Sequence, residues 1–212
     1  MFKERWLGRE PSFPRGPSRH VARSIRPGAD AATVHSVMSD LDARRPDLLS
    51  RLDAVEGRLF RLVAARTPGL TQPDEATGER WEAGQVWAHI AEFVPYWLGE
   101  MERVVAGGKE PGAPDPVPYG RTKTDPGRIA PIERDRREDP GALLRRASDG
   151  IARARAFAGA LPEGGWRAVG LHPTRGEQTI AAILQDSLVS HLEEHADQLD
   201  GLVGHGEAAG AE

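Results

Sequence analysis

Apolar side chains recur at three- and four-residue spacing in four stretches of the chain, which is the spacing of one helix face. These stretches cover approximately residues 46–67, 82–106, 140–161 and 177–202. No stretch alternates apolar and polar residues over the length of a half-buried strand. The pattern therefore predicts an all-α protein of four amphipathic helices, arranged as a four-helix bundle.

Prolines and glycines mark the ends of the predicted helices. Pro46 can occupy the first turn of the first helix, where its missing N–H costs nothing. Gly107 follows the second helix, and Asp139 with Pro140 supplies an N-cap and a first-turn proline for the third. Pro95 falls inside the second helix, and we expect it to kink that helix.

Glycine and proline, which account for 24 and 17 of the 212 residues, gather between the predicted helices. Residues 107–141 hold seven prolines and six glycines, and residues 162–176 form a shorter block of the same kind. A connection as long as the first block is usually functional, or it crosses from one end of a domain to the other. We therefore expect a long crossover between the second and third helices.

Both ends of the chain lack apolar periodicity. Residues 1–37 carry seven basic and three acidic side chains, and such a segment buries too little apolar surface to offset its ordering entropy. We interpret it as a disordered basic tail, and a start at Met38 would make it an extension of the gene model. The predicted bundle covers residues 38–204 and stops at Gly204, with a second disordered tail over 205–212.

Composition excludes several classes of protein. The chain has no cysteine, so it can form no disulfide, iron–sulfur cluster or cysteine nucleophile. Its net charge of −4 provides no general attraction to nucleic acid. No apolar run approaches the roughly 20 residues of a membrane span, and the Arg-rich N-terminus lacks the apolar core of a secretory signal. We therefore expect a soluble, cytoplasmic protein that binds neither nucleic acid nor membrane.

Two histidines interrupt the apolar stripe of the fourth helix. His191 and His195 lie four residues apart, so both rings project from one helix face and can chelate one metal ion. His89 lies between apolar positions of the second helix, and it could complete the site across the bundle interior. The alternative is that these are ordinary core histidines, each satisfied by a hydrogen bond.

Several other polar and aromatic residues could have either a functional or a structural role. Glu194 completes an H-x-x-E-H pattern, the inverted zincin motif, but only 17 residues follow His195, too few for the further acidic ligand of that protease class. Glu194 therefore either orients a histidine ring or is a solvated charge, with a weak alternative as catalytic base. We expect His172 to be structural. Four tryptophans line either a substrate pocket or the core, and these are Trp81, Trp87, Trp97 and Trp166.

The motifs around the histidines resemble those of the DinB-like (DinB/YfiT) superfamily. The segment WEAGQVWAHI at 81–90 resembles its second helix, and HPTRGEQTI at 172–180 followed by HLEEHADQL at 191–199 resembles its fourth helix and the preceding turn. The resemblance covers about residues 40–203 and implies an up-down-down-up bundle. It also implies that three histidines, which match His89, His191 and His195, bind zinc, nickel, iron or another divalent ion.

The resemblance also sets the functional expectation. Some members of this superfamily are thiol S-transferases or mycothiol-dependent isomerases, and others are described as metal-dependent hydrolases; dimers are common. We expect a metal-dependent enzyme that activates a low-molecular-weight thiol such as mycothiol for attack on a small-molecule electrophile. The alternatives are a hydrolase that uses metal-bound water and a non-catalytic metal-binding or interaction module. A homodimer is a further expectation from the resemblance alone.

Overall fold

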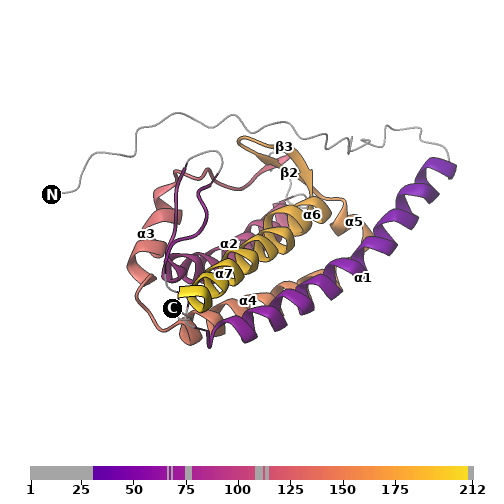
Figure 1. Cartoon of the computed structure of the whole chain (residues 1–212). Helices are drawn as coiled ribbons and strands as arrows, with labels where there is room; N and C mark the ends of the chain where they lie inside the picture. Colours follow the sequence, from indigo (N-terminus) through magenta and orange to yellow (C-terminus); the bar gives the residue numbers. More distant parts are fainter. Residues whose placement is uncertain are drawn as a thin grey trace.

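The computed structural model describes residues 31–65, 67, 69–74, 78–107, 112 and 115–209, with side chains described from residue 45 to residue 203 within this set. Four long helical segments form the bundle (Figure 1). They are α1 (Ala31–Leu62), α2 (Ala83–Gly107), α4 (Pro140–Ala160) and a C-terminal segment made of α6 (Ile180–Ala182), the π-helix η1 (Ile183–Val189) and α7 (Ser190–Ala209). The all-α bundle predicted from apolar spacing is confirmed.

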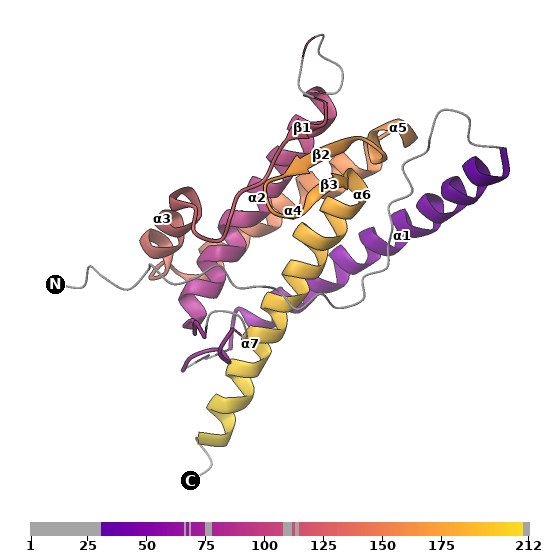
Figure 2. The ribbon, with the colours of Figure 1, turned by 90° about the horizontal axis from the view of Figure 1, so that it is seen from above.

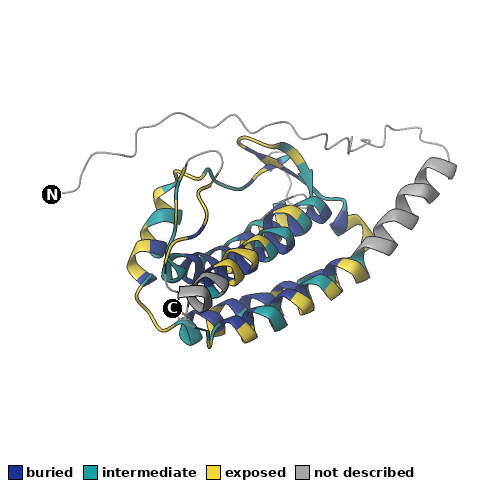
Figure 3. Cartoon of the chain, viewed as in Figure 1, coloured by how far each residue is buried: buried dark blue, intermediate teal, exposed yellow. Residues whose placement is uncertain are grey.

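The helices form a four-cornered arrangement in which α1 packs against α4 and α7, and α2 packs against α4, η1 and α7. Chain direction reverses from α1 to α2, stays the same in α4 and reverses again in α7, which is up-down-down-up (Figure 2). In the described parts of the four long helical segments, the buried residues face the inside of the bundle (Figure 3). The core therefore lies where the amphipathic pattern placed it.

The long crossover between α2 and α4 contains regular structure that the apolar pattern did not predict. It holds β1 (Val117–Pro118) and α3 (Pro126–Asp135). The side chain of Asp125 accepts a hydrogen bond from the Gly127 amide and caps α3, whose first residue is Pro126. The pair Asp139–Pro140 begins α4 in the same way, as predicted.

A small sheet joins this crossover to the segment before the last helix. β1 pairs in parallel with β2 (Val169–His172), and β2 pairs antiparallel with β3 (Gly176–Thr179). The short helix α5 (Glu163–Trp166) lies between α4 and β2. The strands are too short for a period-two pattern to be recognised, which explains why they were missed.

Several predicted boundaries are wrong. α1 begins at Ala31 and includes Pro46, so residues 31–37 are helical where a tail was predicted. The last helix begins at Ile180, because Glu177–Thr179 belongs to β3, and it continues past Gly204 to Ala209. Residues 1–30 and 210–212 of the predicted tails lie outside the described residues. No helix in the described ranges has both the length and the apolar character needed to cross a membrane.

Candidate metal centre

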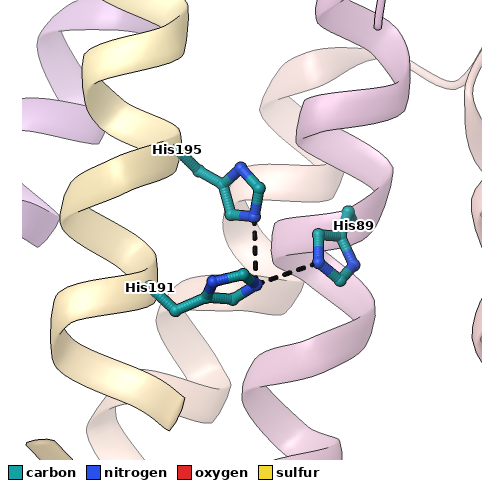
Figure 4. A group of neighbouring side chains, drawn as sticks. All are labelled: His89, His191 and His195. Carbon is teal, nitrogen blue, oxygen red and sulfur yellow. Dashed lines mark hydrogen bonds between the residues drawn. The ribbon is translucent and has the colours of Figure 1, made fainter. Parts of the chain in front are cut away.

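Three histidine side chains meet between α2 and α7 in the interior of the bundle (Figure 4). His89 comes from α2, and His191 and His195 come from successive turns of α7. Only 3% of His89 and 5% of His195 is exposed, whereas the side chain of His191 is 32% exposed. The group is therefore closed on two sides and reached from solvent on the side of His191.

The ring nitrogens converge on one point. The Nε2 atom of His191 lies 3.2 Å from Nε2 of His89 and 3.2 Å from Nε2 of His195, and one nitrogen from each ring lies within 4.8 Å of the other two. Two nitrogens bound to a tetrahedral ion at 2.0–2.1 Å stand roughly 3.3 Å apart. The observed spacing therefore fits a shared divalent cation.

The other nitrogen of each ring faces an oxygen carried three residues further along the helix. Nδ1 of His195 lies 2.8 Å from Oε1 of Gln198, and Nδ1 of His191 lies 3.2 Å from Oε2 of Glu194. Nδ1 of His89 makes no hydrogen bond to a described residue, because the nearest carboxylate oxygen, Oε2 of Glu92, lies 3.6 Å away. An oxygen at Nδ1 favours the tautomer with its proton there, which leaves the Nε2 lone pair free.

The electrostatics of the group also suit a cation. Burial, followed by the neighbouring histidines, holds the pKa of His89 and that of His195 well below the usual value, so both rings are neutral at neutral pH. With Nδ1 as the donor in His191 and His195, the Nε2 lone pairs of these two rings would face each other and Nε2 of His89. A cation satisfies all three at once, and the residues present therefore fit a metal ion.

Aromatic side chains wall the group on its buried sides. The indole of Trp81 stacks on His195 with ring centroids 6.1 Å apart and stands edge-on to His89 at 5.3 Å. The ring centroid of Phe93 lies 4.7 Å from that of His191 and 5.0 Å from that of His89. These rings keep water from the inner side of the histidines, so a ligand approaches from the side where His191 is exposed.

Two arginines of the crossover, Arg121 and Arg128, lie near the group of three histidines. The Arg121 guanidinium donates to both carboxylate oxygens of Glu92, at 2.5 and 2.6 Å, and lies 3.7 Å from the ring centroid of Tyr96. Arg128, in the first turn of α3, lies over the Trp81 ring at 5.3 Å. Sequence reasoning missed both arginines, although the Asp125–Pro126 pair would have located the start of α3.

The remaining candidates fall outside the group of three histidines. His172 is buried in β2, 6.2 Å from the Trp97 ring, and a Cβ added to Gly120 would meet its Cδ2 atom at 2.3 Å. It therefore packs the crossover against the sheet, in keeping with a structural role. Trp87 and Trp166 belong to the core. Glu193, next to Glu194 in α7, forms an ion pair with Arg51 of α1 at 2.6 Å.

The fold and this histidine arrangement together define a four-helix bundle with a candidate metal centre. Neither a protein-family model nor a curated protein matches the sequence. Two solved structures match: mycothiol-dependent maleylpyruvate isomerase, with a TM-score of 0.56, and a histidine-to-alanine mutant of it, with a TM-score of 0.55.

Both are crystal structures with 14% sequence identity to this chain, and each match covers 73% of this chain and 60% of the other. This chain therefore spans about three fifths of the length of that isomerase. At this identity the likeness concerns the fold alone, and it agrees with the predicted four-helix bundle.

Proposed function

We propose that this chain is a metal-dependent enzyme that activates a low-molecular-weight thiol for reaction with a small electrophile. His89, His191 and His195 would hold the divalent cation, which is zinc, nickel or iron. The convergence of their three Nε2 atoms carries the proposal. A bound divalent cation lowers the pKa of a thiol or water beside it, which provides a nucleophile at neutral pH.

The residues around the histidines would each have a distinct part. Gln198 and Glu194 orient the His195 and His191 rings through their Nδ1 atoms, and the Trp81 and Phe93 rings exclude water from the inner side. Three protein ligands leave room for an exogenous ligand, as in catalytic rather than structural sites. Because the chain has no cysteine, the thiol must come from a cosubstrate.

The fold neighbour supports a thiol as that cosubstrate, since its name describes a mycothiol-dependent isomerase. We propose mycothiol or a related thiol for this chain and S-transfer as the reaction. Turnover of an activated ester with water alone would favour the alternative of a hydrolase.

Metal content and thiol consumption test the proposal together. Purified wild-type protein is expected to hold about one divalent ion per chain by elemental analysis, and His89→Ala, His191→Ala and His195→Ala are each expected to lose it. His172→Gln, a buried histidine outside the group, is the matched control and should keep the ion. Thiol consumption with 2-chloro-1,3-dinitrobenzene should fall to the uncatalysed rate in the three ligand variants. Wild-type protein without metal, or ligand variants with full activity, would contradict the proposal.

A further inference from the structure

A half-buried cation, Arg128, stands beside the histidines, and no acidic side chain among the described residues forms an ion pair with it. The guanidinium of Arg128 lies 5.3 Å from the centroid of the Trp81 ring, and that ring in turn contacts His89 and His195. Its Nη1 donates to the backbone carbonyl of Lys123 at 3.0 Å. Most of the five N–H donors of this guanidinium are therefore left for another acceptor.

The neighbouring carboxylates are already used by other cations. Glu92 is bound through both oxygens to Arg121, and Asp74 lies 3.5 Å from Nζ of Lys123. Among the described residues, no carboxylate comes within ion-pair distance of Arg128, although the charges of Glu79, Glu92 and Asp74 act on it from further away. Arg121 and Arg128 thus differ, because only the first is neutralised by a direct partner.

The position of Arg128 carries an energetic cost. Burial lowers its pKa, because a guanidinium removed from water loses hydration that one backbone carbonyl and the Trp81 ring replace only in part. Its positive charge also reaches the histidines, where it adds to burial and to the other rings in lowering the pKa of His89 and of His195. An anionic group beside Arg128 would relieve this cost, and it would stand next to the candidate metal centre.

We propose that Arg128 binds a carboxylate group of the substrate and holds its reactive carbon near the three histidines. The substrate class is then a small electrophile that carries a carboxylate, and this identification of the bound molecule as substrate rests on the proposed function. A planar guanidinium matches one carboxylate through two parallel hydrogen bonds. The Trp81 ring beneath Arg128 fixes the plane of the guanidinium and provides an apolar floor for the rest of the molecule.

Equilibrium binding tests the subsite without any turnover. Benzoate is titrated calorimetrically into the purified protein and into the same protein after chelator treatment, with neutral benzamide as the isosteric comparison. Arg128→Gln is expected to weaken benzoate binding by roughly tenfold or more in both forms, since a hydrogen-bonded ion pair is lost. It should leave benzamide unaffected, and Arg128→Lys should retain part of the affinity.

The matched control is Arg137→Gln, which removes an exposed cation after the end of α3. Arg137→Gln should leave benzoate binding, metal content and thermal unfolding unchanged. Arg128→Gln should match wild type in metal content and in thermal unfolding. Equal benzoate affinity in wild type and Arg128→Gln would overturn the subsite. Tighter binding of phenyl phosphate than of benzoate would overturn the choice of a carboxylate.

A matched pair of electrophiles connects the subsite to the reaction. In 4-chloro-3,5-dinitrobenzoate and in 2-chloro-1,3-dinitrobenzene, the thiol sulfur forms a bond to the ring carbon, the C–Cl bond breaks, chloride leaves and the thiol proton passes to solvent. Arg128→Gln should raise KM roughly tenfold or more for the carboxylate-bearing compound alone. An equal effect on both compounds would overturn substrate recognition by Arg128. If wild type consumes neither compound but still binds benzoate through Arg128, the proposed function fails and the anion subsite stands.

Discussion

Each of the three histidines has a polar side chain three residues further along its helix, and two of these side chains are within hydrogen-bond distance. Glu92, Glu194 and Gln198 each lie three residues after a histidine, and residues at this spacing are neighbours on one helix face. Of the three, Gln198 makes the shortest contact, and its partner His195 is buried, whereas Glu194 is 69% exposed. We therefore expect Gln198 to contribute most to the orientation of its ring.

Gln198→Ala should weaken metal binding by about 10-fold to 100-fold, because the His195 ring loses the acceptor that fixes its tautomer. Glu194→Ala should have a smaller effect, since water can replace an exposed carboxylate. Competition with a chromophoric chelator measures both affinities. Gln185→Ala, in η1 on the same helical segment, is the control, because its amide donates only to its neighbour Asp186 among the contacts described. An affinity for Gln198→Ala equal to that of Gln185→Ala would contradict this role.

The sequence could predict the three histidines but not the two arginines. His191 and His195 are related by helix geometry, and His89 lies on an apolar face that had to turn inward, so their approach follows from local periodicity. Arg121 and Arg128 lie in a segment rich in proline and glycine, where no period shows which way a side chain points. Their positions depend on how the crossover packs, which is a tertiary property.

Among the elements, α3 lies close against the start of α2. A Cβ added to Gly84 would meet the backbone carbonyl oxygen of Arg136, at the end of α3, at 2.0 Å. A backbone atom cannot rotate away as a side chain can, so the two helices would have to separate. Because Gly84 has no side chain, α3 can pack this closely against α2, and this packing places Arg128 near the histidines.

Gly84→Ala should destabilise the protein by about 1–3 kcal/mol through overpacking, and it should also weaken benzoate binding because α3 moves. Gly99→Ala is the matched control in the same helix, where an added Cβ meets nothing within 4 Å. Replacing an exposed helical glycine by alanine there should stabilise the protein by roughly 0.5–1 kcal/mol. Urea unfolding of the two variants measures both effects, and destabilisation of equal size in both would contradict the close approach.

Helix boundaries were predictable where a capping side chain and a proline coincide, as at Asp139–Pro140. A proline without a capping side chain did not mark a boundary: Pro46 was predicted to begin the first helix, but it lies inside α1. The π-helix η1 is a second feature that the sequence pattern could not predict. Its wider turn changes the phase of the helix, so the three consecutive residues Ser187, Leu188 and Val189 are all buried. A pattern that assumes 3.6 residues per turn cannot anticipate this change.

In the whole molecule, ion pairs hold the crossover against the bundle. Asp135, at the end of α3, is 4% exposed and accepts hydrogen bonds from Arg134 and from Arg146 of α4. The hydrogen bond from Arg134, with that from Arg146, holds the pKa of Asp135 below its usual value. A carboxyl group with a lowered pKa stabilises the folded state above its unfolded pKa and loses that contribution as pH falls through the folded pKa.

Asp135→Asn should therefore lower the free energy of unfolding by about 1–3 kcal/mol at pH 7, the usual range for a charged hydrogen bond. The difference from wild type should shrink as pH falls below 3.8, the ordinary pKa of an aspartate side chain. Urea unfolding over a pH series measures it. Asp149→Asn, at an exposed position of α4, is the control and should show little difference at any pH. A pH-independent effect of Asp135→Asn would show that its charge is not the cause.

The wide separation of the histidines along the chain bears on how a metal would be acquired. His191 and His195 become neighbours as soon as α7 forms, whereas His89 is 102 residues from His191 and arrives only when the bundle closes. An ion added during folding would first meet a two-nitrogen chelate on one helix. Its full set of protein ligands would be completed with the closing of the tertiary fold, so metal loading and the final folding step would occur together.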